Sequence, residues 1–300
     1  MNRQPHRRAS VYSTLAALLT WLATLLLPLS ASEAAPFTFL QPGFFQEIYG
    51  VTSHFQGGIA FAPDGDVWVN FCQFNGSPLS RLDLQSTTTV HSTVVHPDVS
   101  GSPFTSAAGC GLTNHPDGTL YSNIDNGTNG VANLNVNTGA VIRFLGPPGN
   151  ALGITVDPQT NHLIYVGKDC RFTATCSILD LDPATGTTRA FATLPATDAS
   201  FVDGIAFDPT GAFLFVSNRA PAHRLTVLNR AGAVVRHVAM SSEPDGIAFH
   251  SVAPKFVVTD NTDGTVTRFD FPNDDFTLPP TVQPCKGDRN DDFGAKSKYS

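Results

Sequence analysis

The sequence predicts an all-β protein with the architecture of a β-propeller, and three observations support this prediction. The chain of 300 residues is rich in turn formers, with 25 Gly and 22 Pro, and has only 2 Met. One sequence pattern occurs five times, at intervals of 42 to 53 residues. Each copy consists of short apolar runs separated by turn residues, which is typical of strands. Repeats of this length that are made of strands indicate the blades of a propeller.

The composition excludes several other classes of protein. Charged residues make up only 14% of the chain and the formal net charge is −7. This argues against a coiled coil, a helical bundle and a charge-rich disordered chain. It also argues against a nucleic-acid partner, because such binding needs a surplus of Lys and Arg to neutralise phosphates. The hydrophobic fraction of 41% is sufficient for a packed core.

Residues 1–34 have the three-part pattern of a secretory signal peptide. A basic start is followed by the apolar run Leu15–Leu29, and small residues, Ser32 and Ala34, precede the expected cleavage point. The alternative is an uncleaved anchor, but a run of this length is shorter than the ~20 residues that a spanning helix needs. We therefore expect cleavage after Ala34 and a secreted or periplasmic protein that has no membrane partner.

The fourth copy of the repeat illustrates the four strands expected in each blade. Gly204–Phe207 is a short apolar run, and an Asp-Pro-Thr-Gly turn leads to the alternating stretch Phe213–Val216. Further strands are expected at Arg224–Leu228 and Ala233–Val238. One blade alone exposes both faces, so neighbouring blades must bury them. The apolar residues expected to pack between blades are Ile59, Phe61, Leu112, Ile154, Val156, Ile205, Phe207, Ile247 and Phe249.

The closure of the ring has two possible solutions. The propeller is expected over residues 36–284, with an outer strand at residues 43–49 before the first repeat. After Val282 the apolar pattern ends, and residues 285–300 form a polar tail, which suggests a truncated or altered C-terminus. We expect six blades, of which the sixth is incomplete. Alternatively, residues 43–49 complete the fifth blade and close a five-bladed ring.

The pattern x-D-G-I-A-F-D-P-x-G-x-x-x-x-V-S-N, from Val202 to Asn218, carries a family resemblance. It resembles the six-bladed propellers of the gluconolactonase, regucalcin and luciferin-regenerating family. It is also similar to NHL repeats and to the virginiamycin B lyase group. The resemblance covers residues 57–270. In the lactonases it implies a divalent cation in the central channel, held by a Glu, an Asn and an Asp that each precede the Gly of an inner strand.

Carried over to this sequence, the resemblance supplies two of the three cation ligands. Asp203 falls at the Asn position and Asp245 at the Asp position, whereas Gly57 stands where the family has Glu. Asp203 and Asp245 are therefore predicted to bind Ca²⁺ or Mg²⁺, which prefer oxygen ligands. Such a cation could polarise a lactone or ester carbonyl, with a nearby Asp as general base. Alternatively, an Asp before Gly caps a turn through its own backbone.

The ends of the second strands should lie on the same face of the ring as the starts of the inner strands. This follows from antiparallel pairing of the two strands. Polar residues at these ends are the candidates for substrate binding. They are Asp125, Asp169, Asn218 and Asp260.

Five cysteines in an exported chain indicate disulfides. Cys170 and Cys176 flank a short hairpin connection and are expected to pair. Cys72 and Cys110, on the same face of neighbouring blades, are a second expected pair, which leaves Cys285 over. A soft-metal site is the rival interpretation of two cysteines, but further ligands are lacking.

Three functions fit these observations. The first is a metal-assisted lactone or ester hydrolase that uses Asp203 and Asp245, which the pairing of the two Asp residues favours. The second is a non-catalytic propeller that binds a small-molecule, carbohydrate-like or protein ligand, which Gly57 favours. The third is a defective copy with an open ring and no activity. In the first two cases we expect a monomer.

Overall fold

The computed structural model is all-β, as the composition predicts. It describes residues 56–71, 77–90, 93–99, 104–171, 175–195, 197–198, 201–219, 222–250, 256–261 and 266–285. Within these ranges the helical segments are two single 3₁₀ turns, η1 (Lys168–Cys170) and η2 (Pro272–Asp274). No helix in the described ranges is long and apolar enough to cross a membrane.

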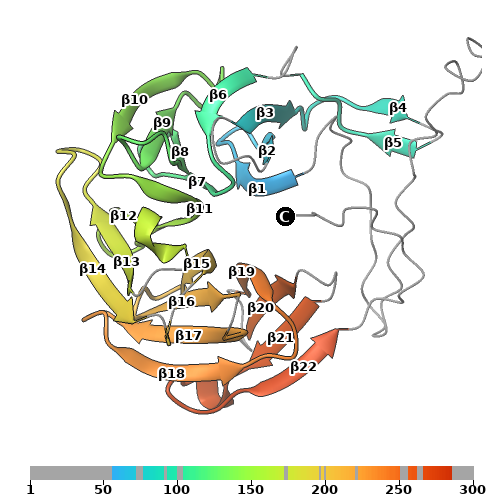
Figure 1. The fold of residues 1–300 in the computed structure, drawn as a ribbon. Helices are drawn as coiled ribbons and strands as arrows, with labels where there is room; N and C mark the ends of the chain where they lie inside the picture. Colours follow the sequence, from blue (N-terminus) through green and yellow to red (C-terminus); the bar gives the residue numbers. More distant parts are fainter. Residues whose placement is uncertain are drawn as a thin grey trace, which may run out of the picture. The chain divides into compact units, whose positions relative to one another are not determined.

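The described residues form five four-stranded antiparallel sheets, arranged around a common axis as in a β-propeller (Figure 1). Sheet 1 contains β1 (Gln56–Phe61), β2 (Val67–Phe71), β3 (Ser77–Leu82) and β6 (Phe104–Ala108). Sheet 2 contains β7 (Leu112–Asn114), β8 (Leu120–Asn123), β9 (Val131–Leu134) and β10 (Val141–Leu145). Sheet 3 contains β11 (Gly149–Val156), β12 (Leu163–Gly167), β13 (Thr175–Leu181) and β14 (Thr188–Pro195).

Sheets 4 and 5 follow the same plan. Sheet 4 contains β15 (Val202–Phe207), β16 (Phe213–Asn218), β17 (Arg224–Asn229) and β18 (Val234–Ala239). Sheet 5 contains β19 (Pro244–His250), β20 (Phe256–Asn261), β21 (Val266–Asp270) and β22 (Thr281–Cys285). The inner strands β1, β7, β11, β15 and β19 contact one another in this order. In sheet 4 the four predicted strands are confirmed to within two residues at each end.

The structure differs from the expectations in two places. The first repeat contains an additional hairpin, β4 (Thr88–Val90) paired with β5 (Thr93–Val95). The fourth strand of sheet 5 is β22, which pairs along the whole of β21. The apolar pattern stops near its start, so the sequence did not indicate it. Residues 43–49, the alternative partner, lie outside the described residues, and the number of blades in the complete ring stays a prediction.

A glycine contact repeats between consecutive inner strands. If Gly111 carried a Cβ, that atom would lie 1.7 Å from the carbonyl oxygen of Leu152, the residue before the next repeat's glycine. The corresponding distance is 2.5 Å from Gly58 to Cys110 O and 2.5 Å from Gly204 to Asp245 O. Real Cβ atoms do not approach so closely, so only glycine fits at these positions. The backbones of neighbouring sheets therefore touch next to the axis.

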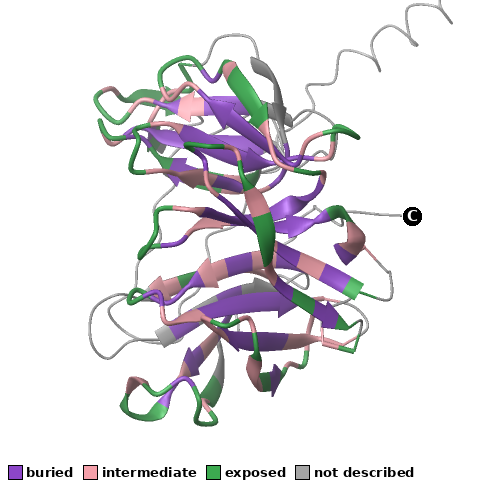
Figure 2. Ribbon diagram, turned by 90° about the vertical axis from the view of Figure 1, so that its left-hand side faces the viewer, coloured by how far each residue is buried: buried purple, intermediate pink, exposed green. Residues whose placement is uncertain are grey.

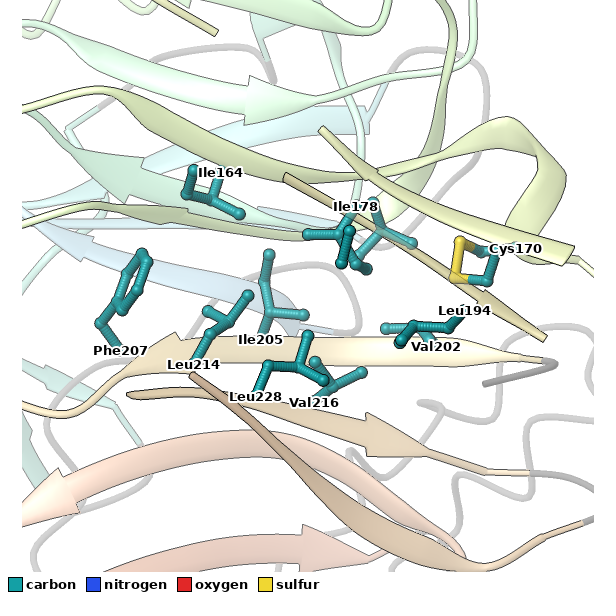
Figure 3. Packing of buried hydrophobic residues seen from close by; sticks show 13 residues of the cluster. Ile164, Cys170, Ile178, Leu194, Val202, Ile205, Phe207, Leu214, Val216 and Leu228 are labelled. Atoms are coloured by element: carbon teal, nitrogen blue, oxygen red, sulfur yellow. A yellow bond between two sulfur atoms is a disulfide. The ribbon is translucent and has the colours of Figure 1, made fainter. Parts of the chain in front are cut away.

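Apolar side chains fill the space between successive sheets. Ile205 and Phe207 of β15 pack against Ile164 of sheet 3, and each of the three is less than 9% exposed (Figure 3). Similar clusters join the other consecutive pairs of sheets. Figure 2 shows the buried residues along the strands and the exposed residues mainly in the connections between them. The predicted packing between blades is confirmed here.

Two of the residues predicted to pack between blades do not do so. Ile59 is 52% exposed and Phe61 is 63% exposed, although both occupy the repeat position that is buried in later sheets. The physical reason is their place on the first sheet, since the face that carries them has no preceding described sheet.

The glycine contact leads to a stability prediction. Gly111→Ala should lower the free energy of unfolding by about 3 kcal/mol, because overpacking against backbone forces two inner strands apart. Gly118→Ala is the matched control: its φ is +82° but nothing lies within 4 Å of the added Cβ. The control should lose only about 1 kcal/mol, the cost of a left-handed alanine. Urea denaturation measures both, and equal losses would contradict the importance of the contact.

Candidate functional site

The predicted pair of aspartates is brought together at the start of two consecutive inner strands. Asp203 and Asp245 lie in β15 and β19, and each falls where the pairing with the second strand shifts register. Such a bulge re-aims the side chains within it. The two strands are fixed by the close approach of Gly204 to the carbonyl of Asp245. The hydroxyl of Ser217 also donates to that carbonyl at 2.6 Å and accepts from the Gly204 N–H at 2.6 Å.

The two carboxyl groups form one interacting pair. The pKa of Asp245 is raised to about 7. Burial is the largest cause, the charge of Asp203 and the hydrogen bond between the two side chains add to it, and Arg219 opposes the shift. One carboxyl of such a pair holds its proton in neutral solution because two adjacent negative charges repel each other in a buried place. The pair therefore titrates as a unit. It can donate and accept a proton near pH 7.

Arg219 holds the pair in place. Its Nη1 donates to Asp203 Oδ2 at 2.7 Å, and its Nε lies 3.5 Å from Glu243 Oε2. The guanidinium also lies 5.3 Å from the ring centroid of Phe201. Burial alone would lower the pKa of Arg219, but Asp203 and the other carboxylates outweigh it, so the net shift is upward. Arg219 is thus permanently charged and stabilises the ionised form of Asp203.

A second group of charges surrounds η1. Lys168 Nζ donates to Asp125 Oδ1 at 2.9 Å. Burial lowers the pKa of Arg171, and the negative charges of Asp125 and Asp203 partly offset this shift. Its Nη2 donates to the carbonyl of Asn150 at 2.5 Å. Arg171 therefore connects the charges around η1 electrostatically with the aspartate pair.

The other residues predicted to bind substrate make local contacts. Asp169 accepts from the N–H and the hydroxyl of Ser177, at 3.1 and 2.8 Å, and so attaches η1 to β13. Asn218 is buried and donates to the carbonyl of Asp198 at 3.0 Å. The side chain of Asp260, in β20, lies outside the described part of the chain. A role of these residues in substrate binding stays a prediction.

One of the two predicted disulfides is confirmed. Cys170 and Cys176 are joined, and both are fully buried beside η1. Cys110 is also disulfide-bonded. Cys72 lies outside the described residues, so its pairing with Cys110 stays a prediction. A disulfide is typical of proteins that fold in an oxidising compartment.

The described side chains do not fit the predicted Ca²⁺ or Mg²⁺ site. No group of three His, Cys, Asp or Glu residues in the described ranges is placed to hold a metal ion. Asp203 and Asp245 supply oxygens, but one of them is bound by the Arg219 guanidinium, which competes with a cation. The positions that correspond to them in sheets 2 and 3 are Cys110 and Leu152, which offer no oxygen from their side chains.

The sequence interpretation missed two members of the site. Arg219 stands next to Asn218 at a second-strand end, so its place on this face was predictable, but its role was not assigned. Glu243 precedes the Pro-Asp-Gly motif of Asp245 and was not singled out. Its Oε1 lies 3.5 Å from Nε2 of His223, which adds an imidazole to the edge of the cluster. A charged residue directly beside a repeat motif is the signal that could have identified both.

The comparisons with known proteins show the fold. No family model and no curated protein matches the sequence. Among solved structures, virginiamycin B lyase from Staphylococcus aureus is similar with a TM-score of 0.51 and 15% identity, over 80% of this chain and 87% of that one. The PQQ-bound aldose sugar dehydrogenase from Streptomyces coelicolor is similar with a TM-score of 0.54 and 15% identity, over 83% and 86%.

A third similar structure is hydrazine synthase from Kuenenia stuttgartiensis. Its TM-score is 0.53 and its identity 16%, over 72% of this chain and 64% of that chain. The lyase and the dehydrogenase are both β-propellers. At this level of identity the likeness shows the β-propeller fold and does not single out the gluconolactonase family. The chain is a β-propeller protein.

The aspartate pair predicts how stability depends on pH. The unfolded chain releases the Asp245 proton near pH 3.8, whereas the folded protein retains it to about pH 7. Between these values the folded state binds more protons, so the free energy of unfolding should fall as the pH rises. In Asp245→Asn this fall should be smaller, and at pH 8 the variant should be more stable than the native chain.

Urea denaturation between pH 4 and pH 8 measures this difference. Asp275→Asn is the control, because the Asp275 side chain is exposed and its hydrogen bonds with Thr277 lower its pKa. Asp275→Asn should leave the pH dependence of the free energy of unfolding between pH 5 and pH 8 unchanged. An Asp245→Asn variant that keeps the native slope would show that the pair does not share a proton.

Proposed function

We propose that this protein is an exported β-propeller that hydrolyses a lactone or ester, with Asp203 and Asp245 as its acid–base pair. The observation that supports this most strongly is the contact between the buried carboxyl group of Asp203 and the half-buried one of Asp245, with Arg219 held at 2.7 Å from Asp203. A carboxylate and a carboxylic acid side by side can accept one proton and donate another in a single step.

In the proposed reaction both aspartates return to their starting protonation states at the end of each cycle. A water oxygen attacks the carbonyl carbon while its proton passes to the Asp203 carboxylate. The proton of Asp245 passes to the carbonyl oxygen, which gives a neutral tetrahedral intermediate. When the intermediate collapses, the bond to the alkoxy oxygen breaks, that oxygen takes the proton from Asp203, and a hydroxyl proton returns to Asp245. Arg219 keeps Asp203 ionised at the start of each cycle.

Export is proposed on two independent observations. The first 34 residues have the pattern of a signal peptide, and the mature part contains the Cys170–Cys176 disulfide. A small, carbohydrate-like substrate from outside the cytoplasm would fit this location.

The non-catalytic alternative also has a specific observation in its favour. Gly57 and Leu152 stand at two of the five positions that precede the inner-strand glycines, and neither has a polar side chain. A ligand could therefore be held on one side of the axis by the charged cluster and on the other by apolar contact. Such a protein would bind sugars or lactones without converting them.

The hydrolytic proposal is tested with a panel of lactones and nitrophenyl esters. Asp245→Asn and Asp203→Asn should each lower kcat/KM by about 10²- to 10⁴-fold, the usual contribution of an acid or base. Native activity should decrease above pH 7 as Asp245 loses its proton. Asp275→Asn is the folded control and should retain full activity. Binding of a panel member without turnover, or full activity of Asp245→Asn, would contradict the proposal.

The divalent cation is tested separately by thermal unfolding. A cation that binds only the folded protein must raise the melting temperature as its concentration rises. If Asp203 and Asp245 hold it, millimolar CaCl₂ or MgCl₂ should raise the melting temperature of the native chain but not of Asp245→Asn. Because the described side chains do not fit a Ca²⁺ or Mg²⁺ site, we expect neither ion to raise the melting temperature specifically. A shift that Asp245→Asn abolishes would establish the metal site instead.

A further inference from the structure

The face of sheet 1 that points away from sheet 2 is apolar, and it is exposed at its inner strand, whereas Val67, Val69 and Leu82 of its second and third strands are only 3 to 5% exposed. It carries Ile59 and Phe61 of β1, which are 52% and 63% exposed. They lie opposite Val69 and Val67 of β2, and Val67 in turn lies opposite Leu82 of β3. Residues directly opposite each other in an antiparallel pair project from the same face. We call these five residues the leading face of sheet 1.

In the later sheets the same face is covered. Leu112, Ile154 and Ile205 occupy the position of Ile59 in sheets 2, 3 and 4, and each is only 6 or 7% exposed. Phe207, which corresponds to Phe61, is 7% exposed and forms an edge contact with Phe191 of the preceding sheet at 6.0 Å. The repeat therefore places apolar residues where a preceding sheet covers them. For sheet 1, the part of the chain that would cover them is not among the described residues.

Sheet 5 offers a poor counterpart for this face. Val257 and Phe269 point from sheet 5 toward sheet 4. Because side chains alternate along a strand, Val266 and Arg268 project from the other side. Val266 is 38% exposed, and Arg268 binds Asp270 through three hydrogen bonds. Among the described side chains on this side, a charged, hydrogen-bonded arginine stands where sheets 3 and 4 present aliphatic residues to each other.

We propose that residues 36–55 of this chain cover the leading face of sheet 1. This segment joins β1 directly, and its 20 residues span up to about 66 Å when extended, which is ample to fold back over one sheet. It contains five Phe and a single charged residue, Glu47. An apolar segment of this composition gains by leaving water, and the described strand that follows it directly exposes Ile59 and Phe61 of the leading face.

The sequence of the segment also suits a layer of strands. Pro42-Gly43 is a turn signal between two runs, residues 37–41 and residues 44–49. In the first run Phe37 and Phe39 alternate with a polar residue, as in a strand with one apolar face. Two strands of five or six residues are as long as β1 and β2. The segment can therefore supply a short hairpin in the place that a preceding sheet would fill.

Photo-crosslinking in the mature full chain tests this proposal. The photoreactive amino acid p-benzoylphenylalanine is placed at position 61 and, as a matched control, at position 207. After irradiation the crosslinked peptides are identified by mass spectrometry. Position 207 should crosslink to β14, where Phe191 lies. Position 61 should crosslink within one chain to residues 36–55, and Phe44→Ser combined with Phe45→Ser should reduce that yield at least fivefold without changing the control.

The other occupants are distinct outcomes of the same experiment. A crosslink from position 61 to residues 256–285 would show that sheet 5 covers the face. A crosslinked dimer would show that a second copy does, and the absence of any peptide crosslink would show that the face is open to water. Each of these results overturns the proposal. Hydrogen exchange on the unsubstituted chain gives a second measurement: residues 44–49 should be protected, and exchange at the rate of a free peptide overturns the proposal.

Discussion

The contact between a glycine and the carbonyl group of the next inner strand is the constraint on which the structure depends. It is repeated from Gly58 to Cys110, from Gly111 to Leu152 and from Gly204 to Asp245. Because the backbones meet there, each residue that precedes a repeat glycine is held at the same height near the axis. Two of these residues are aspartates on consecutive sheets. The candidate site is therefore a consequence of how the sheets pack, since the contact that joins β15 to β19 also brings Asp203 and Asp245 together.

Polar residues of the second strands reinforce this contact. Ser217 donates to the carbonyl of Asp245, and Asn70 at the corresponding place in sheet 1 donates to the carbonyl of Cys110 at 3.0 Å. In both cases the carbonyl is buried, and leaving it without a donor would cost about 1 to 3 kcal/mol. These two hydrogen bonds thus satisfy the carbonyl groups that the close approach of the strands removes from water. At the corresponding place in sheet 3 the chain has Val166, so there the glycine contact is supported by apolar packing.

Much of the fold could be predicted from the sequence, because the repeat encodes each sheet locally. The turn after Phe207 and the alternation in Phe213–Val216 are sufficient to place β15 and β16, and the common position before glycine predicts that Asp203 and Asp245 meet. The strand β22 was not predictable, since Pro284 and polar residues hide its pattern and pairing with β21 alone defines it. The role of Arg219 was equally hidden, because it depends on one side chain that reaches carboxylates of two different sheets. The exposure of Ile59 was missed because a repeat describes the average sheet, whereas no described sheet precedes the first one.

The distribution of charge near the axis explains why one aspartate of the pair differs from the other. Arg219 donates directly to Asp203, so the ionised form of Asp203 has a partner. For Asp245 the described part of the chain shows no such cationic donor, and burial together with the negative charge of Asp203 raises its pKa to about 7. Two chemically identical side chains at equivalent repeat positions therefore take different protonation states. The asymmetry arises from a single residue, Arg219, that has no counterpart at the corresponding position after β20, where the chain has Thr262. A change of one residue beside one copy of the repeat thus makes two equivalent aspartates electrostatically different.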